Sequence, residues 1–245
     1  MGLILNSGFT IGPGVVLNGG YNTVLTSGLR LYLDAGNVNS YPGSGNTWTD
    51  LIGSKIFYFY GAPTYNSANG GYINFNPSNS DYAQCSTSLS TLSTWSVEVW
   101  HYYDYGTTGS APAILTEIYT NNSLNYALGN DNGSGLSIGY YDGADGSNTG
   151  WHYTPGYAFG FGNWYHIVGT YDGSALKLYI NGHLVESTAA SSAIRSSNSG
   201  IRLMSRWDNP DFWGGRLSVV RIYNNDITQM GVTNNFNAER TRFGI

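Results

Sequence analysis

Residues 164–187 read WYHIVGTYDGSALKLYINGHLVES and carry the clearest strand and turn signals of the chain. It holds three runs rich in β-branched and aromatic residues, HIVGTY, ALKLYI and HLVE, separated by Asp-Gly at 172–173 and Asn-Gly at 181–182. Both pairs supply the positive φ angles that tight hairpins require. In the middle run the aliphatic residues alternate with Lys177 and Tyr179, the period of two that a half-buried strand shows. The stretch predicts an antiparallel meander.

The composition fits a single β domain whose surface carries few charges. Charged residues make up 10% of the 245-residue chain, against about 25% in an average soluble protein. The net charge of −5, with only eight arginines and two lysines, provides no basic stripe for a phosphate backbone, so we expect no nucleic-acid partner. No run approaches the roughly 18 apolar residues of a membrane span, so we expect no membrane insertion.

The chain divides into an N-terminal arm, residues 1–25, and a body, residues 26–245. The arm has short apolar alternations broken by Gly and Pro, and it could pair within its own sheet or add a strand to a neighbouring subunit. Its expected attachment residues are Phe9, Ile11, Val15 and Leu17. The body shows further strand patterns, and their regular spacing predicts an all-β sandwich or jelly roll. These patterns cover residues 29–34, 72–76, 95–103, 112–120, 125–130, 135–142, 200–206 and 215–224.

One short helix is expected near the C-terminus, in DITQMGVTNNFNAER. Asp226 or Thr228 can cap it, and Met230 and Phe236 are expected to face the sheet.

Residues 164–187, followed by FWGGRLSVVRIYNNDITQMGVTNNFNAERTRFG at 212–244, resemble the laminin-G-like branch of the concanavalin A-like lectin/glucanase superfamily. The earlier stretches LRLYLDAGNVNSYPGSGNTWTDLIG and PTYNSANGGYINFNPSNSDYAQC resemble the version of this domain found in virion proteins of tailed bacteriophages, including cyanophages. The resemblance covers roughly residues 28–245. It implies a concanavalin A-like jelly-roll sandwich of two antiparallel sheets. The resemblance does not determine the function, because lectins, glycosidases and viral structural proteins all share this fold. The lone Cys85 departs from secreted members that carry a disulfide.

Catalysis is not expected from the carboxylates. Glycosidases of this superfamily resemble one another in a Glu-x-Asp-x-Glu strand, and a retaining pair of carboxyl groups lies about 5 Å apart. None of the four glutamates has an aspartate two residues away. We interpret Glu98, between two tryptophans in WSVEVWHYY, as an outward or edge residue. Carboxylates distant in sequence could still meet, so a carbohydrate-active enzyme using Glu98 or Glu117 is kept as an alternative.

Calcium is the one cofactor that the resemblance suggests, because laminin-G-like domains often carry an ion held by carboxylates. Two pairs have suitable oxygen-ligand spacing, Asp142 with Asp145 and Asp208 with Asp211. Asp-Gly and Asp-Asn pairs also simply make turns, and we favour that interpretation.

Aromatic residues gather in two loop regions and provide candidate binding residues. Aromatic faces stack on sugar rings, and the same residue types also dominate subunit interfaces. The candidates for glycan binding or an interface are Tyr140, Tyr141, Trp151, Tyr153, Trp207 and Trp213.

Together these features predict a non-catalytic surface protein of a bacteriophage virion, a capsid decoration or a tail-fibre component, with a lectin-like fold. Its expected partners are other virion proteins or copies of itself, and surface polysaccharide. The N-terminal stretch lacks the basic region and unbroken apolar core of a secretory signal, so we expect synthesis in the host cytoplasm without a signal peptide. The alternatives are a carbohydrate-active enzyme and a free lectin.

Overall fold

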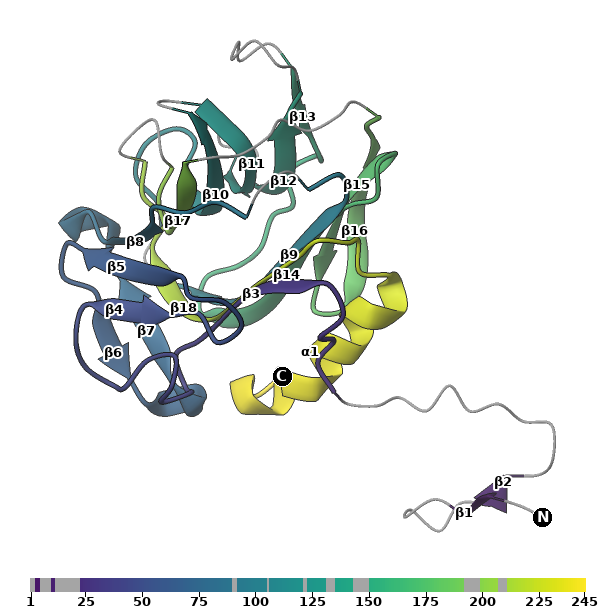
Figure 1. Ribbon diagram of the computed structural model, residues 1–245, viewed down its shortest axis with the longest axis horizontal. Coiled ribbons are helices and arrows are strands. Elements are labelled where there is room, and N and C mark those ends of the chain that lie inside the picture. Colours follow the sequence, from purple (N-terminus) through teal and green to yellow (C-terminus); the bar gives the residue numbers. More distant parts are fainter. Residues whose placement is uncertain are drawn as a thin grey trace.

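The computed structural model is a sandwich of two antiparallel β-sheets with one helix, as predicted (Figure 1). It describes residues 3–4, 10–11, 23–89, 92–104, 106–120, 123–130, 135–142, 150–191, 199–206 and 211–245. None of the helices in these ranges is long and apolar enough to cross a membrane.

The first sheet, called sheet I, contains the predicted meander. Its strand order is β16 (His183–Ala189), β15 (Ala175–Ile180), β14 (Asn163–Tyr171), β9 (Trp95–Tyr103), β18 (Gly215–Tyr223), β7 (Tyr72–Phe75) and β6 (Thr64–Asn66), and β3 (Leu29–Asp34) also pairs with β18.

The second sheet, called sheet II, packs its inner face against sheet I. Its strand order is β13 (Trp151–Tyr153), β12 (Leu136–Tyr141), β11 (Ser123–Asn130), β10 (Ala113–Thr120), β17 (Gly200–Leu203), β8 (Tyr82–Cys85), β5 (Ile56–Tyr60) and β4 (Thr47–Thr49). Two short 3₁₀ turns, Ala68–Gly70 and Pro77–Asn79, flank β7.

The turns predicted in the meander are confirmed. Asn181 and Gly182 both have positive φ, 50° and 82°, as the two-residue β15–β16 turn requires, and in the β14–β15 turn Gly173 has φ of 92°. Asp172 organises the other turn, because its Oδ1 accepts the backbone N–H groups of Ser174 and Ala175. The alternating aliphatic side chains of β15 are buried, with Leu178 at 0% exposure. One large apolar cluster, formed by the inner faces of both sheets, is the main core.

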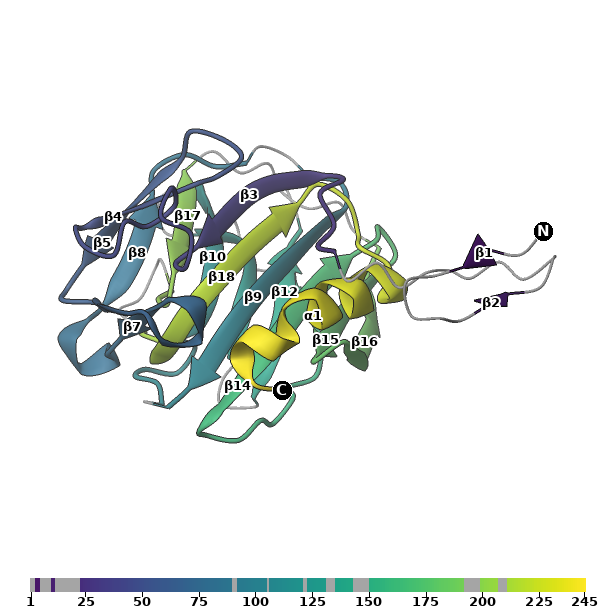
Figure 2. The ribbon, with the colours of Figure 1, turned by 90° about the horizontal axis from the view of Figure 1, so that it is seen from below.

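The helix α1 (Gln229–Phe243) covers the outer face of sheet I (Figure 2). Thr228 is the N-cap, and its side chain accepts the N–H of Gly231. Trp100 of β9 stacks on Phe236 and on Phe243, with ring centroids 5.9 and 4.1 Å apart. The expectation that Met230 faces the sheet is wrong: its side chain is 57% exposed, whereas Phe236 does pack on the sheet.

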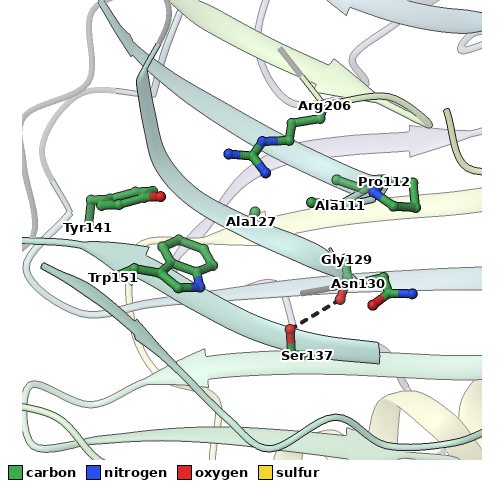
Figure 3. A pocket seen from close by; sticks show the side chains of 10 residues that line it. Ala111, Pro112, Ala127, Gly129, Asn130, Ser137, Tyr141, Trp151 and Arg206 are labelled. Atoms are coloured by element: carbon green, nitrogen blue, oxygen red, sulfur yellow. Dashed lines mark hydrogen bonds between the residues drawn. The ribbon is translucent and has the colours of Figure 1, made fainter. Parts of the chain in front are cut away.

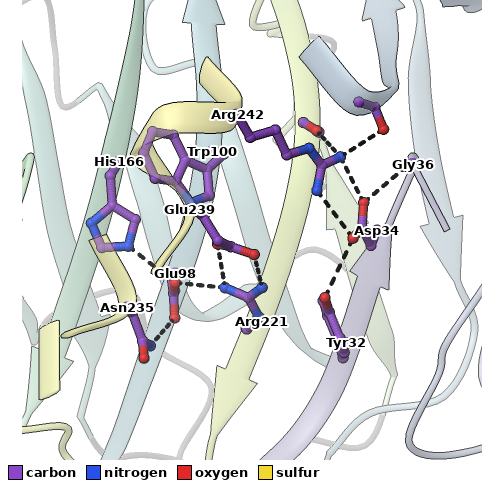
Figure 4. A network of polar contacts seen from close by, with 12 residues as sticks. Tyr32, Asp34, Gly36, Glu98, Trp100, His166, Arg221, Asn235, Glu239 and Arg242 are labelled. Carbon is purple, nitrogen blue, oxygen red and sulfur yellow. Dashed lines mark hydrogen bonds and ion pairs between the residues drawn. The ribbon is translucent and has the colours of Figure 1, made fainter. Parts of the chain in front are cut away.

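A buried polar network lies beneath this helix (Figure 4). Glu98 of β9 is completely buried and accepts hydrogen bonds from Arg221 at 2.8 Å, from His166 at 3.0 Å and from Asn235 of α1 at 2.7 Å. Arg221 also pairs with Glu239 of α1. The interpretation of Glu98 as an outward or edge residue is correct only for the face, because Glu98 lies on the outer side of sheet I. It is not an edge residue, since β9 is a central strand, and the helix buries its side chain completely.

The arm is described in residues 23–25 and in two short strands, β1 (Leu3–Ile4) and β2 (Thr10–Ile11), which pair with each other. Of the expected attachment residues, Ile11 lies in β2. The other three, Phe9, Val15 and Leu17, lie outside the described residues. Attachment through the arm therefore stays a prediction.

Candidate functional site

The outer face of sheet II carries a shallow hollow with a floor of small residues (Figure 3). Its volume is about 40 Å³. Ala113 of β10 lies directly opposite Gly129 of β11, which lies opposite Ser137 of β12. Ala127 adds a fourth small side chain to the floor. Because three neighbouring strands present small side chains at this point, the face sinks there, and a ligand can approach the sheet closely.

An aromatic wall bounds one side of the hollow. Tyr141 ends β12 and lies opposite Trp151 of β13, with ring centroids 4.6 Å apart. Tyr153 follows on the same face, 6.4 Å from Trp151, and is 44% exposed. Gly139 makes room for the indole, since a Cβ there would come within 2.5 Å of Trp151 Cζ2. The glycine therefore lets the tryptophan ring lie over β12.

Polar groups complete the hollow on its other sides. Ser137 Oγ donates to the carbonyl of Gly129 at 3.2 Å, which holds the hydroxyl at the floor. Asn130 lines the same end. Figure 3 shows the side chain of Arg206 reaching over the hollow towards Tyr141 and Trp151. Amide, hydroxyl and guanidinium groups thus surround an aromatic wall, which is the arrangement of a small-molecule site that binds both apolar and hydroxyl surfaces.

The two outer faces of the sandwich differ in a way that singles out this site. The outer face of sheet I is covered by α1, and its aromatic residue Trp100 is 0% exposed. The outer face of sheet II has no described helix over it and presents exposed rings. The candidate binding surface of the described chain is therefore the outer face of sheet II.

The predicted aromatic candidates separate into two groups. Tyr141, Trp151 and Tyr153 come together at the hollow. Tyr140 does not, because neighbouring residues of a strand face opposite sides; its side chain is 0% exposed in the core, and its hydroxyl donates to that of Tyr171. Trp213 is likewise a core residue, 2% exposed. These two positions are corrected to core residues. Trp207 lies outside the described residues.

The predicted calcium ligands described by the structure have other partners. Asp211 is 3% exposed, and its Oδ2 accepts the backbone N–H groups of Ser110 and Ala111. Asp142 Oδ2 lies 2.8 Å from Nε2 of His152. In the part of the chain that is described, no three His, Cys, Asp or Glu residues cluster as metal ligands. The carboxylate of Asp211 therefore ties its own segment to the distant loop at Ser110 and Ala111, instead of forming the local turn that the sequence favoured. Asp145 and Asp208 lie outside the described ranges.

Neither glutamate of the enzyme alternative lies at the hollow. Burial by itself would raise the pKa of Glu98, but the charge of Arg221 and the hydrogen bond from His166 outweigh it and lower that pKa to about 2. Glu117 is buried and accepts hydrogen bonds from the Leu89 N–H and from Asn125. Glu98 is therefore held as a carboxylate under the helix, on the opposite sheet from the hollow.

A second aromatic group lies on the same face, at residues that were not among the predicted candidates. Tyr58 and Tyr60 of β5 and Tyr82 of β8 lie near Arg202 of β17. The run IFYFY at 56–60 carries the signal, because its phenylalanines and tyrosines alternate.

Comparison with solved structures finds the same fold in proteins of low sequence identity. Domain 4 of AbnA, an extracellular arabinanase of Geobacillus stearothermophilus solved with arabinotriose, superposes with a TM-score of 0.67 at 20% identity, covering 86% of this chain and 98% of that one. The binding domain of Paraclostridial Mosquitocidal Protein 1 gives a TM-score of 0.67 at 14% identity, covering 86% and 52%. The Trypanosoma rangeli sialidase in complex with sialic acid gives 0.64 at 13%, covering 91% and 35%. The chain thus spans about half of the toxin domain and about a third of the sialidase.

A search among curated proteins finds no match. A family model described as Concanavalin A-like lectin/glucanases superfamily matches residues 77–233, most of the described body. This match agrees with the two-sheet architecture and with the solved structures above. The chain belongs to the concanavalin A-like lectin/glucanase superfamily.

Proposed function

We propose that the protein is a non-catalytic carbohydrate-binding protein whose sugar site is the hollow on sheet II. The observation that carries this proposal is the wall of Tyr141, Trp151 and Tyr153 beside a floor of small residues. The faces of sugar rings that carry C–H groups stack on aromatic rings, while hydroxyl groups need hydrogen-bonding partners. Asn130, with Arg206 beyond it, provides such partners within the same hollow.

The small volume of the hollow indicates the kind of binding. About 40 Å³ is far below the roughly 300 Å³ or more of a pocket that encloses a small molecule. A sugar would therefore rest on the face of sheet II, with one ring face against Trp151 and the other side in solvent. This geometry suits a saccharide that is part of a larger polymer.

The fold neighbours are consistent with this proposal. The arabinanase domain was solved with arabinotriose and the sialidase with sialic acid, while the matching part of the mosquitocidal toxin is its binding domain. At these identities the likeness extends to the fold alone, so the proposal rests on the residues of the hollow.

The non-catalytic part of the proposal is supported by the positions of Glu98 and Glu117. Both are buried and engaged in hydrogen bonds, and Glu98 lies beneath α1. A glycosidase would need a carboxylic acid and a second carboxylate on either side of the bound sugar. Incubation of the protein with arabinan, β-1,3-glucan, alginate or bacterial surface polysaccharide should release no reducing sugar. If sugar were released by the wild type and not by Glu117→Gln, that result would support the enzyme alternative.

We further propose that the protein acts on the surface of a bacteriophage virion and contacts host or environmental polysaccharide there. The support is the resemblance of residues 29–53 and 63–85 to phage virion domains. A chain lacking residues 1–25 should keep the fold of the body and fail to join particles that contain the full chain. If the shortened chain were incorporated normally, the arm would not be needed for attachment to the particle.

The test of sugar binding is isothermal titration calorimetry with arabinan, β-1,3-glucan, alginate and polysaccharide from bacterial surfaces. We expect saturable binding to at least one of them, reduced about tenfold or more in Trp151→Ala. The matched control is Phe161→Ala, because Phe161 is 61% exposed but packs on Tyr103 of sheet I. Absence of binding to every probe, or equal losses in both variants, would overturn the proposal.

A further inference from the structure

A second group of aromatic residues lies on the outer face of sheet II, towards its other edge. Tyr58 and Tyr60 of β5 are 49% and 44% exposed, whereas Phe57 of the same strand is fully buried. Tyr60 stacks on Tyr82 of β8, with ring centroids 4.6 Å apart and the planes 5° from parallel. We call Tyr58, Tyr60 and Tyr82 the tyrosine platform. Tyr58 and Tyr60 are neighbouring exposed rings, and a group of exposed aromatic residues is unusual unless a ligand or partner covers it.

The tyrosine platform is held in place before any ligand arrives. The guanidinium of Arg202 lies over the Tyr82 ring, 4.3 Å from its centroid, and donates to Oε1 of Gln84 at 2.9 Å. Because Tyr60 stacks on Tyr82 in turn, two rings are already ordered. Binding to a preorganised surface loses less conformational entropy than binding to mobile side chains.

The platform is connected to the hollow by direct contacts. Arg202 Nη1 donates to the carbonyl of Arg206, which lines the hollow. On the other side, the Phe212 ring lies 6.3 Å from Tyr82, and Phe212 forms a β-bridge with Ala113 at the floor of the hollow. The two aromatic regions therefore lie on one face of sheet II and are linked by packed residues.

The register of sheet II shows that outward-facing residues form a row that runs across the strands. One row of directly opposed residues crosses seven strands, from β5 to β13: Tyr58, Gln84, Arg202, Thr116, Ala127, Gly139 and Tyr153. With neighbouring strands about 4.8 Å apart, the six steps of the row span roughly 29 Å. An exposed tyrosine stands at each end. The middle of the row is covered by neighbouring groups: the Thr116 hydroxyl donates to the carbonyl of Ser205, and the indole of Trp151 lies over Gly139. A ligand that crosses here would rest on these covering groups.

We propose that the tyrosine platform is a second sugar-binding subsite and that the ligand is an extended polysaccharide chain lying across the strands from β13 to β5. This inference rests on the proposed function, since it extends the sugar site at Trp151. A single terminal sugar would use the hollow alone and leave the platform uncovered. A chain that crosses the sheet covers both aromatic regions and meets the amide of Gln84 and the guanidinium of Arg202 between them.

The experiment uses oligosaccharides of increasing length, prepared by partial hydrolysis of whichever probe polysaccharide the full chain binds. In the wild type, affinity should rise with length and level off once the oligosaccharide spans both regions. The double variant Tyr58→Ala/Tyr60→Ala should lose about tenfold in affinity for the longest oligosaccharides and keep the wild-type affinity for the shortest. Trp151→Ala should lose affinity at every length.

The outcomes separate this inference from the proposed function. Binding that depends on Trp151 but shows no length dependence and no effect of the double variant would overturn the second subsite and leave the sugar site standing. Absence of binding to any probe would overturn both. If the double variant fails to fold, Tyr58→Lys replaces it, because that change leaves the Tyr60–Tyr82 stack intact; unchanged affinity for long oligosaccharides in that variant would equally overturn the inference.

Discussion

Replacing Glu98 by Gln should destabilise the protein strongly, because this carboxylate holds α1 to sheet I. Its Oε1 accepts from His166 and Arg221, and its Oε2 accepts from Tyr223 at 3.0 Å and Asn235 at 2.7 Å. Glutamine removes the charge and turns one acceptor into a donor that faces other donors. Breaking a buried ion pair by removing one partner costs about 3–5 kcal/mol, and we expect a loss of that size in the free energy of unfolding at pH 7.

The pH dependence of the free energy of unfolding gives a second, independent value for the contribution of the Glu98 charge. The pKa of Glu98 is about 2 in the folded protein and 4.5 in its ordinary state, and a difference of about 2.5 pH units corresponds to about 3 kcal/mol. Because the folded pKa is lowered, this stabilisation is present above pH 4.5 and is lost as the pH falls towards 2. The stability gap between wild type and Glu98→Gln should therefore narrow by about 3 kcal/mol over that range.

Urea unfolding followed by tryptophan fluorescence, at several pH values from 7 down to about 2, measures both quantities. Glu186→Gln on the edge strand β16 is the control, and we expect it to change stability by no more than about 0.5 kcal/mol. A loss below about 1 kcal/mol in Glu98→Gln, or a gap that stays constant with pH, would refute the reasoning that the charge of Glu98 anchors the helix.

Three further predictions test the site and the helix. Gly139→Val should displace both the indole of Trp151 and strand β13, because the new Cβ would lie 2.5 Å from Trp151 Cζ2 and 2.7 Å from the carbonyl oxygen of His152, and should weaken polysaccharide binding about tenfold; full affinity would contradict this account of the wall. Calcium or EDTA should leave Tm unchanged, because Asp211 already accepts two backbone N–H groups; a rise in Tm with calcium that Asp142→Asn removes would instead establish the ion site. Arg242→Ala should cost about 1–2 kcal/mol, since it removes the paired hydrogen bonds to Asp34 at 2.8 and 3.1 Å, and should speed amide exchange in the last turn of α1; unchanged exchange would argue against this tether.

Much of the fold could be predicted because its signals are local. The period of two in β15 and the Asp-Gly and Asn-Gly turns depend on neighbouring residues, so the meander is as predicted. β9 begins and ends where the pattern WSVEVWHYY does. The helix was also located, with Thr228 as its cap. Its orientation was harder to predict, because packing decides which side is buried, and Met230 faces solvent.

The site was predicted only in part, because a strand pattern does not say which of its two faces is covered. Tyr140 and Tyr141 are adjacent in sequence and have the same chemistry, yet one lies in the core and the other at the hollow. The sheet partner decides this, since Tyr140 meets Tyr171 of sheet I while Tyr141 meets Trp151 of β13.

The β-sandwich class, the hairpins of the meander and the presence of aromatic residues suited to sugar binding all follow from patterns in the sequence. The role of Glu98 as a buried anchor emerges from the three-dimensional fold alone, because its partners Arg221 and Asn235 lie more than a hundred positions away in the chain. The fold also decided that Tyr58 and Tyr153 end one row of a single sheet. Register between strands joins distant segments through backbone hydrogen bonds, which no local pattern of side chains specifies.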